Sequence, residues 1–262
     1  MVVFPQLSSG AGMQFPSVRK HTLRAASNPL RDGGLVSYAD AGFSKVRWEL
    51  AFRDVTDAEA NGVASLFETV EGRRGTFTFI DPTANLLAHS EDFEQPCWTR
   101  SPMVHTSAGI DDPVGGSGGF RLTNTAGIAQ GTSQELQAPA SFVYAFSVYA
   151  RSAGQTSITM SRAAGSNTHA RSFALGPGWT RCLLSGAFNS AAETVKFALE
   201  IPAASAVDIY GIQAESQPRA SGYKKTGARN GVYAARFDND VLRVMSDGPD
   251  QHRFQLQIVA KD

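Results

Sequence analysis

Short segments in the middle of the chain alternate apolar side chains with polar or small ones. This two-residue period is typical of β-strands that bury one face. The apolar positions are Phe142, Tyr144, Phe146 and Val148 in the first segment, Ile158 and Met160 in the second, Phe173 and Leu175 in the third, and Val195, Phe197, Leu199 and Ile201 in the fourth. Strands at this density predict a β-sandwich.

The first 84 residues predict two strands with one helix between them. Residues 44–52 place an apolar side chain at every second position, and residues 76–80 form another strand that ends at Asp81-Pro82. Thr56 and Glu59 have the spacing of a capping box, which satisfies the first free amides of a helix. The helix then continues with Val63, Leu66, Phe67 and Val70 on one face, and Gly72 is expected to end it in a left-handed conformation.

The end of the chain returns to this strand pattern. An apolar strand over 241–245 and an alternating strand over 253–258 flank a turn at 247–250. A two-stranded hairpin is only marginally stable alone in water, so these strands need the sheet of the first residues. We therefore expect a mostly β protein in which residues 1–84 and 229–262 form one discontinuous β-sandwich or barrel domain with one short helix. A second sandwich, residues 85–228, is inserted into it.

Seven positions before residue 85 match a known pattern, namely Trp48, Phe67, Gly72, Phe77, Phe79, Asp81 and Pro82. Their order resembles the N-terminal domain of phage tail proteins at the distal end of the tail tube. The resemblance implies a structural subunit of the tail tip or baseplate that is assembled in the host cytoplasm. It also implies a homo-oligomeric ring and contacts with tail tube, hub and tape-measure proteins.

The inserted segment carries a motif at each end. Its start reads Asn85-Leu86-Leu87, with Phe93 and Trp98 following, and its end reads Gly211-Ile212-Gln213-Ala214-Glu215 followed by Ser221 and Tyr223. Both motifs resemble the first and last strands of jelly-roll carbohydrate-binding modules that phage tail proteins carry. The resemblance implies a jelly-roll fold and a host-surface polysaccharide as the partner.

Composition and charge exclude several other classes. The 24 basic and 24 acidic residues cancel, so no overall field would recruit nucleic acid or an anionic membrane. The N-terminus lacks the pattern of a secretory signal, and no apolar run is long enough for membrane insertion. Five scattered histidines lack metal-ligand spacing, and no nucleophile elbow or separated acid pair is evident, so we expect no enzyme.

The candidate sugar-binding residues lie on the strand over 142–151 and near it. Sugar sites combine aromatic platforms with planar polar groups. On the strand face opposite the core, Tyr149 and Arg151 follow small residues, and Trp179, Tyr210 and Gln213 could complete the face. The alternatives are that Tyr149 and Arg151 are ordinary surface residues and that Trp179, like Trp98, belongs to the core.

Two further questions stay open at this level. Jelly-roll sugar modules often hold a structural calcium ion between carboxylates of the first and last strands, which makes Glu91, Asp92 and Asp208 candidate ligands; no other cofactor is expected. Cys97 and Cys182 are either two buried thiols or a disulfide.

Three functions remain possible. A tail-tip protein with an outward sugar-binding module is the first. A stand-alone carbohydrate-binding protein, or a non-catalytic module of a glycoside hydrolase, is the alternative, and a module that serves only as a spacer is the third.

Overall fold

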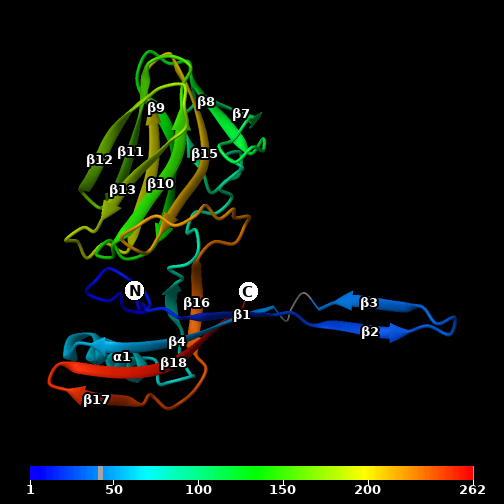
Figure 1. Cartoon of the computed structure of the whole chain (residues 1–262), viewed down its shortest axis with the longest axis vertical. Helices are drawn as coiled ribbons and strands as arrows, with labels where there is room; N and C mark the ends of the chain where they lie inside the picture. Colours follow the sequence, from blue (N-terminus) through cyan, green and yellow to red (C-terminus); the bar gives the residue numbers. More distant parts are fainter. Residues whose placement is uncertain (41–43, 262) are drawn as a thin grey trace. The chain divides into compact units, whose positions relative to one another are not determined.

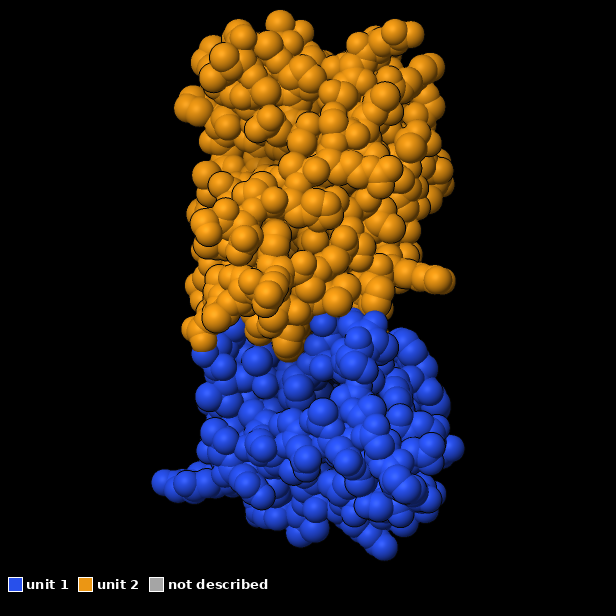
Figure 2. Space-filling view, turned by 90° about the vertical axis from the view of Figure 1, so that its left-hand side faces the viewer, with its two compact units in different colours: residues 1–79, 233–262 blue, residues 80–232 orange. Residues whose placement is uncertain are grey.

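The computed structural model describes residues 1–40 and 44–261, and they form a mostly β protein with one α-helix, as the sequence predicts. The chain divides into two compact units (Figure 2). The first consists of residues 1–79 and 233–262 and the second of residues 80–232. The boundaries expected from the sequence motifs are 84/85 and 228/229.

The first unit is built on one six-stranded antiparallel sheet (Figure 1). Its central strands come from opposite ends of the chain, because β4 (Lys45–Val55) pairs with β18 (Gln251–Lys261). The strand order is β1 (Val18–Thr22), β4, β18, β16 (Val232–Phe237) and β5 (Phe77–Ile80), with β17 (Val244–Gly248) paired to β18. A separate hairpin is formed by β2 (Ala25–Pro29) and β3 (Leu35–Ala39).

The alternating residues of β4 and β18 make the core of the first unit. Trp48 and Phe52 of β4 are almost fully buried, and the Phe52 ring stacks on Phe254 of β18 with 4.8 Å between the ring centroids. Burying a side chain of this size contributes roughly 1.5–3 kcal/mol. The pairing therefore explains why the closing strands belong with the first residues.

The single helix, α1 (Asp57–Thr69), covers this core with Ala60, Val63 and Leu66. The predicted capping box at Thr56 and Glu59 is present, with both reciprocal hydrogen bonds formed. The helix ends through two left-handed residues, because Glu71 has φ 54° and Gly72 has φ 62°. The first left-handed residue is thus a glutamate, which the sequence pattern did not reveal.

Sequence reasoning was less accurate for the other strands of this unit. The predicted strand over 241–245 lies at 244–248 as β17, and its side chains are largely exposed because it is an edge strand. Strand β16 was missed, and so were the three strands within residues 18–39. These three strands expose most of their side chains, so they carry no apolar alternation.

The second unit is a jelly roll, as the sequence predicts. One sheet has the order β13-β10-β15-β8-β7 and the other β12-β11-β14-β9-β6. Between β8 and β15 the chain crosses repeatedly from one sheet to the other, which gives the two interleaved Greek keys of this fold. The strands are β6 (Thr99–Arg100), β7 (Val104–Ile110), β8 (Gly119–Asn124), β9 (Gln130–Gln137), β10 (Tyr144–Arg151), β11 (Thr156–Ala164), β12 (Asn167–Leu175), β13 (Thr180–Gly186), β14 (Thr194–Ile201) and β15 (Ser205–Glu215).

Aromatic rings from the two sheets meet in the jelly-roll core. Tyr144 and Phe146 of β10 contact Phe197 of β14 edge-on, with centroid distances of 5.8 and 5.3 Å. All three side chains are fully buried. The opposite positions of β10, including Tyr149 and Arg151, therefore face outward.

The segment 85–98 was expected to be the opening strand, and this prediction is wrong. It forms a series of turns, although Leu86 and Leu87 are fully buried. The Asn85 side chain fixes its start by donating to the carbonyl oxygens of Ile212 and Lys224 and accepting from the amides of Leu87 and Ala214. Trp98 is a core residue that packs on Phe93 with a centroid distance of 4.9 Å.

The cysteines are not bonded to each other. Cys182 is buried and Cys97 belongs to an exposed position, so the expectation of two buried thiols holds only for Cys182. In the part of the chain that the structure describes, no helix has the length and apolar character needed to cross a membrane.

Candidate functional site

The outward face of the β13-β10-β15-β8-β7 sheet brings together most of the predicted sugar-binding residues. Strand register places Tyr149 of β10 beside Tyr210 of β15 on one side and Arg181 of β13 on the other. One step along the same face, Arg151 lies opposite Asp208. The predicted residues therefore share one surface because neighbouring strands carry them in register.

Three tyrosine rings form a continuous row on this face. The centroids of Tyr149 and Tyr210 are 6.1 Å apart, and those of Tyr210 and Tyr223 are 5.1 Å apart. Tyr149 and Tyr210 are half-buried, so each ring is held by its neighbours while part of it remains open. Burial raises the pKa of both Tyr210 and Tyr223, so both hydroxyl groups stay neutral at physiological pH, and that of Tyr223 already donates its proton to Glu91.

Beside the tyrosine rings, the same face carries a second group of side chains, which combines Arg151 and Asp208 with Trp179. The Arg151 guanidinium lies over the Trp179 ring, 4.6 Å from its centroid, and its Nε is 3.2 Å from Asp208 Oδ2. Asp208 is buried and also accepts from Arg121 Nε at 2.7 Å. Trp179 is thus half-buried on the outward face and does not belong to the core.

Arg181 completes the site, and sequence reasoning missed it. Its guanidinium lies 5.2 Å from the centroid of Tyr149. Its Nη2 donates to Ser147 Oγ at 3.1 Å and to the Ser221 carbonyl oxygen. The signal in the sequence was its position two residues after Trp179, which on a strand places both side chains on the same face.

A bulge in β15 shapes the floor of the site. The register shifts between Ser147 and Tyr149 of β10, and opposite this point Gly211 has φ 64°. A Cβ atom on Gly211 would lie 3.0 Å from Cγ of Tyr223. The glycine therefore allows both the bulge and the close approach of the Tyr223 ring.

Gln213 does not belong to the exposed site, which corrects the prediction from sequence. Its side chain is fully buried; its Nε2 donates to Glu215 Oε2 at 2.8 Å, and its Oε1 accepts from the Lys224 amide at 2.8 Å. Glu215, also fully buried, accepts from the Ser221 amide at 2.9 Å. These two side chains anchor residues 221–224 and so bring Tyr223 to the tyrosine row.

Polar groups border the row on two sides. Asp112 accepts hydrogen bonds from the amides of Val114, Gly116 and Gly118, chiefly that of Gly116, and these bonds lower its pKa. This fixes the glycine-rich loop next to Tyr210, to which Gly118 is close. At the other border, Glu91 accepts from the Tyr223 hydroxyl at 2.9 Å.

The structure does not bring the three candidate calcium ligands together. Asp208 faces two guanidinium groups, Glu91 pairs with Lys225, and Asp92 accepts from the Gln95 side chain at 2.7 Å. A cation would have to compete with arginine for Asp208, and calcium prefers six to eight oxygen ligands. Within residues 1–40 and 44–261, no group of three acidic, histidine or cysteine side chains is placed to hold a metal ion.

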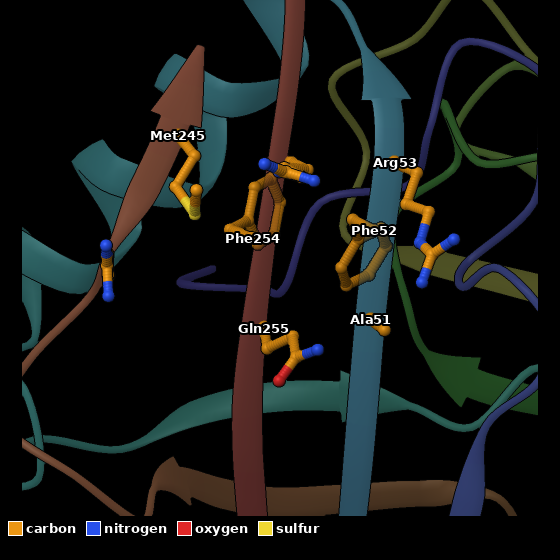
Figure 3. A pocket seen from close by; sticks show the side chains of 8 residues that line it. Ala51, Phe52, Arg53, Met245, Phe254 and Gln255 are labelled. Carbon is orange, nitrogen blue, oxygen red and sulfur yellow. The ribbon is translucent and has the colours of Figure 1, made fainter. Parts of the chain in front are cut away.

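The first unit has its own hollow, formed along strands β4, β17 and β18 (Figure 3). Ala51 and Arg53 of β4 and Gln255 of β18 line it together with Met245 of β17. Arg243 and Arg253 also line it, and Arg253 pairs with Asp247 at 3.2 Å. The hollow is basic with an apolar edge, and it is a second surface on which another molecule could bind.

No protein-family model matches the chain, and no curated protein matches it. Among solved structures, the enzymatically active domain of tailspike protein 4 from bacteriophage CBA120 is 15% identical with a TM-score of 0.41, covering 52% of this chain and 22% of that one. The CBM22-1 xylan-binding domain of Paenibacillus barcinonensis Xyn10C is 16% identical with a TM-score of 0.42, covering 52% and 96%. TmCBM61, solved with β-1,4-galactotriose, is 16% identical with a TM-score of 0.39, covering 50% and 97%. The jelly-roll assignment rests on the strand order described above.

Proposed function

We propose that the jelly roll of residues 80–232 binds a host-surface polysaccharide and that the first unit is a structural subunit of a phage tail tip. The observation that supports polysaccharide binding is the row of Tyr149, Tyr210 and Tyr223 on an outward sheet face. Half-exposed rings fixed by their neighbours suit the apolar face of a sugar ring. The adjacent Arg151 and Arg181 suit hydroxyl groups, and the buried Asp208 holds Arg151 in place.

The geometry favours binding over catalysis. A glycosidase needs two carboxyl groups held on either side of a glycosidic bond. At this site Asp208 is occupied by two arginines, Glu91 pairs with Tyr223 and Lys225, and Asp112 is tied to loop amides. We therefore propose no hydrolytic role for this face.

The test of sugar binding is removal of an aromatic ring. Tyr149→Ala and Tyr210→Ala should each weaken polysaccharide binding by on the order of 1–3 kcal/mol, by analogy with stacking on aromatic side chains. Tyr38→Ala removes an equally large ring at an exposed position of the first unit and serves as the control. Affinity electrophoresis of purified protein in gels with extracts of candidate host surfaces measures the effect. No mobility shift for any protein, the natural one included, would favour the spacer function instead, and equal shifts for all three variants would place sugar binding elsewhere on the protein.

The proposed role of the first unit in a phage tail tip rests on the seven matching positions before residue 85 and on its exposed apolar side chains. Val241, Val244 and Met245 are exposed, and Met245 lines the basic hollow of Figure 3. A ring around the tail tube would cover such patches through repeated heterologous contacts between copies. Its partners would be the tube, hub and tape-measure proteins.

Light scattering during size-exclusion chromatography and imaging of particles test this proposal. A closed oligomer, or density for this chain at the tail tip, is the expected result. A strict monomer that is absent from particles would leave the alternative, a stand-alone carbohydrate-binding protein or a non-catalytic module of a glycoside hydrolase. The alternative uses the same site, because every site residue lies within residues 80–232.

A further inference from the structure

The basic side chains around the tyrosine row differ in whether a carboxylate pairs with them. Arg121 and Arg151 share Asp208, Lys224 pairs with Glu215, and Lys225 pairs with Glu91. Arg181 has no carboxylate partner among the described residues, although it lies beside Tyr149 on the same face. It is also partly buried, which makes an uncompensated charge less favourable than on an open surface.

The hydrogen bonds of Arg181 define where an acceptor can bind. Nη2 is occupied by Ser147 Oγ and the Ser221 carbonyl oxygen. Nε is sealed from solvent and has no partner within the described part of the chain. Nη1 is the remaining nitrogen, and it has no hydrogen-bond partner in that same part of the chain. The guanidinium is held against the Tyr149 ring, so it is already oriented before a ligand arrives.

We propose that Arg181 selects acidic polysaccharides by pairing with the carboxylate of a hexuronate residue whose ring lies on the tyrosine row. This inference rests on the proposed sugar binding and names its ligand class. Carboxylates form the strongest hydrogen bonds with guanidinium groups, because both partners are charged. A neutral sugar would leave the Arg181 charge without a counter-charge, so the site discriminates by charge as well as by shape.

The experiment compares polymers that differ only in charge. Polygalacturonate, alginate and hyaluronate are each measured beside their esterified forms, with neutral galactan and xylan included, by calorimetry on the full chain. We expect at least one acidic polymer to bind 10-fold or more tightly than its ester. Raising the salt concentration from about 0.05 to 0.5 M should weaken binding of the acidic form and leave the ester unchanged, because salt screens charge pairs.

Substitutions of Arg181 test whether this residue causes the preference for acidic over esterified polymers. Arg181→Gln should bring the acid-to-ester affinity ratio to near 1 while ester binding persists, and Arg181→Lys should keep part of the preference because it keeps the charge. Arg171→Gln, on an exposed strand of the other sheet, is the matched control. Melting curves verify that each variant is folded, and if Arg181→Gln is not, Arg181→Lys and the salt dependence of the natural protein decide.

Two outcomes overturn the inference in distinguishable ways. Equal affinity for acid and ester, or an unchanged preference in Arg181→Gln, contradicts the role of Arg181 and leaves sugar binding intact. Failure of every acidic, esterified and neutral polymer to bind contradicts sugar binding itself.

Discussion

The ring of Tyr223 lies directly over the backbone of Gly211. A Cβ atom on this glycine would be 3.0 Å from Tyr223 Cγ and 3.3 Å from Cδ2, and Gly211 has φ 64°. The contact joins the bulge in β15 to the segment that follows the strand. It explains in physical terms why a glycine stands at the start of the Gly211-x-Gln213-x-Glu215 motif.

Gly211→Ala should therefore destabilise the jelly roll and weaken sugar binding together. The left-handed conformation costs roughly 1–2 kcal/mol for a residue with a Cβ, and the Tyr223 ring must also move. Gly222→Ala is the control, since nothing lies within 4 Å of its Cβ position. Thermal melting and polysaccharide binding are measured for both variants. A normal melting temperature for Gly211→Ala would show that the bulge relaxes easily.

The Gln213→Ala variant tests whether Gln213 only supports residues 221–224 or also contacts the sugar directly. The substitution leaves the Lys224 amide and the buried Glu215 Oε2 without the side chain that now binds each of them at 2.8 Å. Leaving a buried partner unsatisfied costs about 1–3 kcal/mol, so two such losses should lower the unfolding free energy by about 2–6 kcal/mol. Gln137→Ala, at the exposed end of β9, should have little effect.

The binding data then identify the role of Gln213. If Gln213 only positions Tyr223, a Gln213→Ala, Tyr223→Ala double variant should bind sugar no more weakly than Tyr223→Ala alone. An additional loss of affinity in the double variant would restore Gln213 as a ligand-binding residue.

The alternation of apolar and polar side chains predicted the strands that bury one face. The site residues that could be found from sequence are those that lie on such strands. Tyr149 and Arg151 were placed on the outward face correctly because the end of β10, from Val148 to Arg151, alternates between buried and half-buried positions. Gln213 was misplaced because the bulge at Gly211 shifts the register and because residues 221–224 cover that end of the face. Arg181 was missed because its significance depends on the strand beside it, and pairing between β10 and β13 is a tertiary property.

Cys182 should react with thiol reagents only when the jelly roll opens. The side chain is fully buried, and burial raises the pKa of its thiol to about 11. At pH 8 this reduces the thiolate, the reactive form, by about a hundredfold relative to an unperturbed thiol. Because the pKa is raised in the folded state, this group favours folding below about pH 9, and that contribution is lost as the pH rises from about 9 to 11.

Mass spectrometry after labelling at pH 8 tests the prediction for Cys182. The Cys182→Ala variant identifies the signal of Cys97, which lies at an exposed position and should be modified first. Urea should accelerate labelling of Cys182 in parallel with unfolding. Rapid modification of Cys182 in the native protein would contradict the packed core described here.

The boundaries of the inserted unit can be tested with two fragments. Residues 80–232 follow the division seen in the structure, and residues 85–228 follow the motifs in the sequence. The longer fragment keeps two hydrogen bonds at the base of the jelly roll, from the Asp81 amide to the Gly231 carbonyl oxygen at 2.8 Å and from the Gly231 amide to the Asn85 carbonyl oxygen at 3.0 Å. Gly231 also packs closely on Leu86, since a Cβ there would lie 2.8 Å from Leu86 Cδ2.

We expect both fragments to fold, with the shorter one less stable. Losing two backbone hydrogen bonds costs roughly 1–3 kcal/mol, which lowers the melting temperature of a domain of this size by about 2–10 °C. Residues 1–79 alone should not fold, because β4 would lose its partner β18 and Phe52 would lose Phe254. Circular dichroism during heating measures all three fragments. A cooperative transition for residues 1–79, or none for residues 80–232, would contradict the description of the jelly roll as an insertion into a discontinuous domain.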